Sequence, residues 1–237
     1  MWYPESKQEL EDFIDQSFKQ KTIKYKPLTK IQGLIVPHAG YEYSGAIAGK
    51  AFSLLKNRKI KKAIILGPSH YANLSGAVTS DLKEWKTSLG NIKLFNKNFP
   101  EGDIEPEHSI KNQVPFLQKL NFKEIMPLMI GNINNEQAKE IAEKISKIKA
   151  VYIFSTDLSH FYNYKNAVQT DKNTVQIIES LDFDNFKNVD ACGYFPLLIM
   201  MHLCKILKTK PHLIEYKNSG DVTWDKSSVV GYASFYF

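Results

Sequence analysis

Residues 33–45 read Gly-Leu-Ile-Val-Pro-His-Ala-Gly-Tyr-Glu-Tyr-Ser-Gly, and this stretch sets a pattern that the chain repeats. The aliphatic run 34–36 predicts a buried strand that ends at Pro37 and delivers His38 into a glycine-bearing turn. We expect Ser44 to cap a helix over residues 44–56. The stretch therefore predicts a strand, a turn that carries a histidine, and a helix in close succession.

The same order returns at two later places in the chain. The apolar run 63–66 leads into Gly-Pro-Ser-His70, and the run 151–154 leads into Ser-Thr-Asp-Leu-Ser-His160. Continuous apolar strands are typical of parallel sheets that are buried on both faces. Loops at the carboxyl ends of such strands meet in one crevice. Three strands that each lead into a histidine thus predict one shared site at one edge of the sheet.

The remaining pattern predicts one α/β domain over residues 1–237, with a mixed, mainly parallel central sheet flanked by helices. Two short segments, 76–80 and 91–95, are expected to pair as antiparallel edge strands, and residues 21–30 to form a connector. Pro115 should lie in the first turns of its helix or bend it. The other expected helices cover residues 5–18, 108–120, 136–147, 165–181 and 195–207, and the other strands cover 123–130, 213–217 and 229–237.

Composition bounds the environment and the partners. No apolar run approaches the ~20 residues that span a bilayer, and the N-terminus lacks the pattern of a signal peptide. We therefore expect a cytoplasmic protein with no membrane partner. The net charge is +6, but Arg58 is the only arginine among 31 basic residues. Readers of nucleic acid and phosphate rely on the guanidinium fork, so a solvated lysine-rich surface is expected in place of a nucleic-acid site.

His38, His70 and Cys192 are the candidate metal ligands. Neutral imidazole is a common ligand of transition metals, and a thiolate is a soft one. Cys192 precedes an expected helix whose positive end would favour the thiolate, which is also a nucleophile. The structural alternatives are histidines that bond locally within their turns and a cysteine that packs as a small hydrophobe. Cys204 lies about 18 Å further along that helix, too far for a disulfide.

Asp157 and His160 are the candidate acid–base pair, because they stand three residues apart in one turn. They could equally orient a metal ligand, and Asp157 could instead cap the next helix. Several further residues are candidates for lining the site; these are Tyr41, Tyr43, His108 and Asp190. His202 and His212, in helix and strand contexts, are expected to be structural.

In these motifs the chain resembles the Memo family, whose members are also known as protein B of the AmmeMemoRadiSam system. The matching stretches are Pro37-His-Ala-Gly-Tyr-Glu-Tyr-Ser-Gly45, Leu66-Gly-Pro-Ser-His70, Glu107-His-Ser-Ile110 with Gln113 and Pro115, Ser155-Thr-Asp-Leu-Ser-His160, Asp190-Ala-Cys-Gly193 and Val229-Val-Gly-Tyr232. They follow the family's order from about residue 30 to the C-terminus.

The resemblance implies a fold similar to that of class III extradiol ring-cleaving dioxygenases, which hold non-haem iron with two histidines and a carboxylate. By this pattern His38 and His70 match the two histidines, Cys192 stands where the carboxylate would be, and His160 with Asp157 lies near the acid–base histidine. Relatives are reported to bind iron or copper. One eukaryotic member resembles a phosphotyrosine-peptide adaptor, and the system's name implies a radical-SAM partner.

Two departures from the family's pattern shape the functional hypotheses. Cys192 in place of a carboxylate favours copper or a thiolate–iron site, with zinc as a further candidate, and makes ring cleavage doubtful. Lys111 stands where family members commonly have an acidic residue, so it either changes the preferred substrate charge or lies on the surface. We expect a metal-dependent redox enzyme acting on an unknown small molecule. The alternatives are a peptide-binding module, with Tyr41 and Tyr43 as recognition aromatics, and a metal carrier.

Overall fold

The computed structural model describes residues 2–20 and 31–237, so the connector expected over residues 21–30 lies outside the described residues. The helices are α1 (Lys7–Lys19), the π-helical turn η1 (Tyr41–Gly45), α2 (Ala46–Ser53), α3 (His108–Lys111), α4 (Val114–Lys119), α5 (Asn135–Ser146), α6 (Tyr164–Ser180), the short turn η2 (Phe186–Asn188), α7 (Tyr194–Leu207) and α8 (Gly220–Thr223). The strands are β1 (Gly33–Val36), β2 (Lys62–Pro68), β3 (Ala77–Ser80), β4 (Glu84–Thr87), β5 (Gly90–Leu94), β6 (Glu101–Gly102), β7 (Glu124–Ile130), β8 (Val151–Ser155), β9 (His160–Tyr162), β10 (His212–Asn218) and β11 (Val229–Tyr236).

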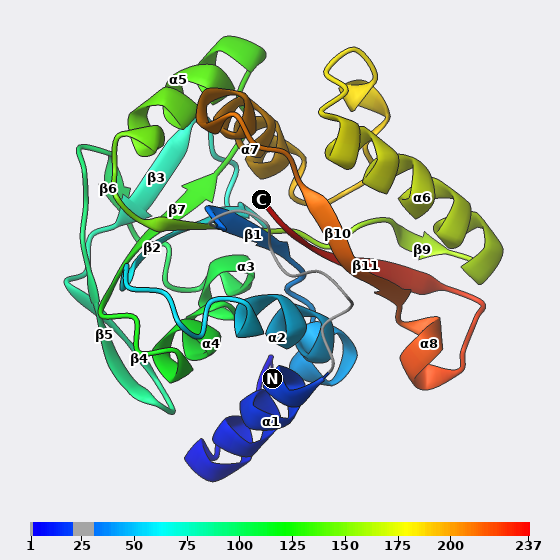
Figure 1. The fold of residues 1–237 in the computed structure, drawn as a ribbon, viewed down its shortest axis with the longest axis horizontal. Helices are drawn as coiled ribbons and strands as arrows, with labels where there is room; N and C mark the ends of the chain where they lie inside the picture. The colour runs from blue at the N-terminus through cyan, green and yellow to red at the C-terminus, as the bar shows by residue number, and fades with distance from the viewer. Residues whose placement is uncertain (1, 21–30) are drawn as a thin grey trace.

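These strands form one 11-stranded sheet with the central order β10-β11-β1-β8-β2-β7-β3-β6 (Figure 1). The four core strands β1, β8, β2 and β7 run parallel to one another. Antiparallel pairs flank this core, with β11 beside β1 and β3 beside β7. The predicted α/β class, with a mixed and mainly parallel central sheet flanked by helices, is confirmed.

Helices cover both faces of the sheet, because successive strand side chains point to opposite sides. Figure 1 shows α1, α2 and α4 on one side of the sheet and α5 and α7 on the other. One core contains Ile35, Ile64 and Phe154 together with residues of α5, α6 and α7. The second core contains Leu34, Ile65 and Ile153 with residues of α1, α2 and α4. This two-sided burial explains why the strands read as unbroken apolar runs.

Three local predictions were wrong. Residues 76–80 and 91–95 do not pair with each other: β3 pairs with β6 and β7, whereas β5 pairs with β4 and β7. The expected helix 108–120 is divided into α3 and α4, and Pro115 occupies the first turn of α4, where its missing N–H is not needed. Ser44 does not cap α2; its hydroxyl donates to the carbonyl of Ala39 from within η1.

Within residues 2–20 and 31–237 no helix combines the length and apolar character required to cross a membrane.

The parallel core fixes the place of the candidate site. β1, β8 and β2 end at Val36, Ser155 and Pro68, and these carboxyl ends lie at the same edge of the sheet.

Candidate metal centre

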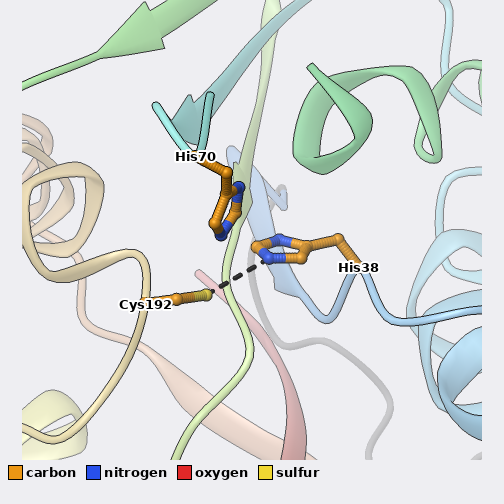
Figure 2. Close-up of side chains that lie close together, drawn as sticks. All are labelled: His38, His70 and Cys192. Atoms are coloured by element: carbon orange, nitrogen blue, oxygen red, sulfur yellow. Dashed lines mark hydrogen bonds between the residues drawn. The ribbon is translucent and has the colours of Figure 1, made fainter. Parts of the chain in front are cut away.

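The turns that follow β1, β2 and β8 bring the predicted ligands together at this edge. His38 follows β1, His70 follows β2, and Cys192 arrives on the segment that precedes α7. Figure 2 shows the two imidazole rings and the thiol pointing toward one another. One ligand atom from each of the three residues lies within 4.8 Å of the others. The structure thus assembles the predicted ligand set from three distant parts of the chain.

His38 is buried and held in one tautomer by its partners. Its Nδ1 lies 3.0 Å from Ser155 Oγ. The Ser155 hydroxyl donates its hydrogen to the Ser109 carbonyl, so it can only accept from His38. Nδ1 therefore carries the proton, and the unprotonated Nε2 lies 3.2 Å from Cys192 Sγ. Burial lowers the pKa of His38 well below its usual range, which keeps this imidazole neutral.

His70 is held in the equivalent tautomer by a carboxylate. Its Nδ1 and its backbone N–H each lie 2.8 Å from an oxygen of Glu107. A carboxylate only accepts, so His70 Nδ1 carries a proton and its Nε2 keeps a lone pair. Burial alone would raise the pKa of Glu107, but hydrogen bonds from His70 and Ser109 outweigh burial and lower this pKa to about 2. A carboxylate behind a histidine is a common support of metal sites.

The Cys192 sulfur lies within hydrogen-bond distance of the backbone of Asp157 and the ring of His38. The backbone N–H of Asp157 lies 3.2 Å from Sγ. The loop approaches β8 closely, because a Cβ at Gly193 would lie 2.5 Å from the Cβ of Thr156. The expected thiolate is not favoured in the metal-free site: burial and the neighbouring Asp157 raise the pKa of Cys192 above its ordinary value. A bound cation would offset this effect.

Asp157 also lies in the cluster. Its Oδ1 accepts from the backbone N–H of His38 at 2.8 Å, and its Oδ2 lies 4.0 Å from His38 Nε2. Asp157 does not cap the next helix, because Asn163 fills that position at the start of α6. Burial raises the pKa of Asp157 to about 7, although hydrogen bonds from His38 and Ala39 oppose the rise.

His160 opens the short strand β9 and is close enough to act electrostatically on the cluster. Its charge contributes to the lowered pKa of His38. Burial lowers the pKa of His160 itself, and the charge of Asp190 opposes that effect. Asp190 is not a member of the ligand group, and its backbone N–H donates to Thr174 Oγ1 on α6 at 3.1 Å.

His108 adds a third imidazole beside the ligands. Its ring centroid lies 4.5 Å from that of His70 and 5.4 Å from that of His38. Trp2 stacks on the His108 ring with a centroid distance of 4.0 Å. The Nδ1 of His108 lies 2.9 Å from the Tyr71 hydroxyl. An open cavity of about 590 Å³ begins at this wall, which Trp2, His108 and Lys111 help to line. His108 lines this cavity, whereas His38, His70 and Cys192 do not.

A family model described as Memo-like protein matches residues 1–236. The chain belongs to the Memo-like family. The MEMO1 family protein of Thermoplasma volcanium is 33% identical over 256 residues, covering 98% of this chain and 94% of the relative. The corresponding protein of Methanobrevibacter smithii is 34% identical over 275 residues and covers 100% and 96%. That of Sulfurisphaera tokodaii is 36% identical over 231 residues and covers 86% and 81%.

The two tyrosines of the first Memo-like motif have different surroundings. Tyr41 is 4% exposed, stacks on Phe116 and donates its hydroxyl to the carbonyl of Asn112. It is a core residue, and its burial argues against the recognition role that the peptide-binding alternative assigns to it. Tyr43 is 37% exposed.

Lys111 pairs with Glu105 at 3.2 Å, and both residues line the cavity.

Glu107 and Ser155 bond to the two histidines of the cluster but were not among the predicted site residues. Both belong to Memo-like motifs that were already apparent, and both stand next to or near a predicted site residue. Gln113, which the motif also contains, donates to Ser155 Oγ at 2.9 Å and to the Pro37 carbonyl at 2.9 Å. Their acidic and hydroxyl side chains within these motifs are the sequence feature from which a role beside the histidines could have been predicted. Trp2 carried none, because no local pattern links it to His108.

Proposed function

We propose that this Memo-like protein holds one redox-active transition-metal ion, iron or copper, between His38, His70 and Cys192. The observation that carries the proposal is the state of the two imidazoles. Each has its Nδ1 proton engaged by an acceptor, Ser155 or Glu107, so each keeps the Nε2 lone pair that a metal requires. Two lone pairs of fixed tautomer beside one sulfur form a preorganised donor set.

The donor set fits such an ion in three respects. Two imidazoles and a thiolate suit iron, copper and zinc better than they suit magnesium or calcium. A cation would also favour the thiolate form of Cys192, whose pKa burial otherwise raises. Three protein ligands leave room for an exogenous one, and the His70 side chain is 28% exposed, so the cluster is accessible from solvent.

The surrounding residues would serve the reaction as acid, base and support. When bound, iron or copper supplies electron transfer and Lewis acidity. Asp157 can hold or release a proton beside His38 near neutral pH, because its pKa is raised to about 7. His160 is the second candidate acid–base group. We propose a redox reaction on an unidentified small molecule and do not extend it to ring cleavage, because Cys192 replaces the carboxylate.

Metal analysis of anaerobically purified protein tests this proposal. We expect near-stoichiometric iron or copper in the parent protein and its loss in His38→Ala, His70→Ala and Cys192→Ala. The chain offers matched controls, since His212 is exposed on β10 and Cys204 lies in the core against Met200. His212→Ala and Cys204→Ala should therefore retain the metal. Zinc alone would refute the redox reaction, and failure of the parent to take up added iron, copper or zinc would refute the site.

A peptide-binding module is the alternative favoured by one observation, the cavity of about 590 Å³ walled by Trp2 and His108. Such a module should bind its peptide with unchanged affinity after His38→Ala, because His38 is buried behind His108. A metal carrier, in contrast, should exchange its ion rapidly and show no turnover. A redox enzyme should lose turnover in His38→Ala and hold its ion through repeated turnovers.

A further inference from the structure

The sulfur of Cys192 is carried by a loop, whereas His38 follows a strand of the sheet closely. The loop, residues 190–193, precedes α7 and belongs to no strand. His38 lies two residues beyond the end of β1, and β1 pairs with β8. A ligand group that is assembled from separate elements needs contacts that fix one element relative to another. The contacts between this loop and the end of β8 therefore bear on where the sulfur lies relative to the His38 ring.

Thr156 directly follows β8, and its side chain bonds to this loop. Thr156 is 1% exposed, and its backbone N–H donates to the carbonyl of Val36 at 2.9 Å, which anchors it to the end of β1. Its Oγ1 accepts from the backbone N–H of Gly193 at 2.9 Å and donates to the carbonyl of Asp157 at 2.8 Å. The same carbonyl accepts from the N–H of Cys192 at 3.2 Å. One hydroxyl thus joins the end of the sheet to the residue that follows Cys192.

The loop also approaches Thr156 as closely as a glycine allows. A Cβ at Gly193 would lie 2.5 Å from the Cβ of Thr156 and 3.0 Å from the carbonyl oxygen of Ser155. Any larger residue at this position would push the loop away from β8. The hydrogen bond and the close approach therefore act on the same residue, the immediate neighbour of Cys192.

The sulfur itself lies beside this anchor and points at the His38 ring (Figure 2). Cys192 Sγ is 3.8 Å from Thr156 Oγ1 and 3.2 Å from His38 Nε2. The proton of the His38 ring is on Nδ1, so Nε2 accepts and the Cys192 thiol donates. A displacement of the loop by about 1 Å would take the sulfur beyond hydrogen-bond range of the ring.

We propose that Thr156 is a positioning residue, whose hydroxyl holds the loop against the end of β8 and so directs the Cys192 sulfur at His38 Nε2. The role deepens the proposed function and rests on it, because Cys192 and His38 are two of the proposed ligands. Asp157 contacts the loop through its backbone, and its carboxylate bonds to His38. Thr156 is therefore the residue of this turn whose hold on the loop a substitution can remove.

Matched variants separate positioning from a general loss of stability. Thr156→Val keeps the shape of the side chain and leaves the buried N–H of Gly193 without its acceptor. Thr156→Ser keeps the hydroxyl, and Gly193→Ala keeps Thr156 but forces the loop away from it. The control is Thr79→Val, because Thr79 is also 1% exposed and its hydroxyl donates to the Pro127 carbonyl at 2.7 Å, outside the cluster.

The first readout is the nitrogen signal of His38 Nε2 in metal-free protein, measured by long-range proton–nitrogen NMR correlations and assigned by its absence in His38→Gln. Cys192→Ala gives the value of this signal without the sulfur. We expect Thr156→Val and Gly193→Ala to move the signal from the parent value toward that of Cys192→Ala. Thr156→Ser and Thr79→Val should keep the parent value.

The second readout is the binding of cobalt(II), because a cobalt–thiolate bond absorbs in the near ultraviolet. We expect this absorption in the parent, and in Thr156→Val we expect cobalt affinity to fall by about 10-fold to 100-fold, the range for residues that support metal ligands. Thr156→Ser and Thr79→Val should leave both the absorption and the affinity unchanged.

A parent-like Nε2 signal in Thr156→Val would overturn the proposal, and so would an equal change in Thr79→Val. If Thr156→Val does not fold, Gly193→Ala decides by the same criterion. Where the parent binds cobalt, an unchanged affinity in Thr156→Val overturns the proposal as well and leaves the ligand set intact. A parent that binds no cobalt would count against the proposed metal site, and the metal-free signal would still decide the role of Thr156.

Discussion

The two histidines of the cluster perform the same task with different supports. His38 is buried, and its Nδ1 donates to the neutral hydroxyl of Ser155. His70 is partly exposed, and its Nδ1 donates to the buried carboxylate of Glu107. Hydrogen bonds to an ionised partner are about twice as strong as neutral ones. The more accessible histidine therefore has the stronger support.

The difference bears on the charge of the site. By the resemblance to extradiol dioxygenases, Cys192 stands in place of a carboxylate ligand, which implies the loss of a hard, anionic donor. Glu107 supplies a negative charge behind His70, one hydrogen bond away from this imidazole. Its hydrogen bond makes the Nε2 of His70 a more basic donor. In the proposed metal site, negative charge would therefore come from two places, the sulfur of Cys192 and the carboxylate behind His70.

The largest expected effect of this asymmetry is on acid stability. The pKa of Glu107 is depressed from 4.5 to about 2, so its contribution to folding is fully present above pH 4.5 and is lost as the pH falls toward 2. We expect about 3 kcal/mol from this group. Denaturant unfolding of metal-free protein between pH 7 and 2 should show this loss in the parent and not in Glu107→Gln. Glu105, which is half-buried and pairs with Lys111, provides the control Glu105→Gln. Superimposable profiles of the parent and Glu107→Gln would contradict the assignment.

Metal affinity should respond next most strongly. Glu107→Gln is expected to weaken binding by about 10-fold to 100-fold, because outer partners of ligating histidines have effects of this size. Competition with a chromogenic chelator measures the affinity, and Glu105→Gln should leave it unchanged. An affinity equal to that of the parent would mean that the carboxylate does not support His70 as a ligand.

Ser155→Ala sharpens the comparison because it removes the neutral support of His38. One neutral hydrogen bond contributes about 0.5–1.5 kcal/mol, so we expect metal affinity to fall by only about twofold to tenfold. Ser180→Ala, at a hydroxyl on α6 that bonds to the Gln176 carbonyl, is the control in the same chelator assay. A larger loss than in Glu107→Gln would reverse the ranking of the two supports.

The smallest effect is expected at Lys111. Its ion pair with Glu105 joins side chains that are 31% and 44% exposed, and such pairs contribute at most about 1 kcal/mol. Lys111→Ala should therefore change the free energy of unfolding by no more than this and leave metal affinity within about twofold of the parent. A tenfold change in affinity would show that the charge of Lys111 reaches the cluster.

Much of this arrangement could be predicted from local sequence. Apolar runs that end in turns fixed the three site strands, and the parallel character of those runs placed His38, His70 and His160 at one edge. The pairing partners of β3 and β5 could not be predicted, because register between distant segments depends on packing that no local pattern records. The raised pKa of Cys192 also escaped prediction, since burial depends on the whole fold whereas the helix terminus is visible in the sequence.

The strand order has a consequence for how the protein folds. β8 lies between β1 and β2, so the first two histidine-bearing strands are joined in the sheet only through a strand from the second half of the chain. The contacts of His38 with Ser155 and Cys192 span 117 and 154 positions. Contacts of such length close late and slow folding. A nascent chain cannot complete the proposed ligand set before Cys192 has been synthesised. Metal uptake would therefore follow the synthesis of the strands β1, β2 and β8.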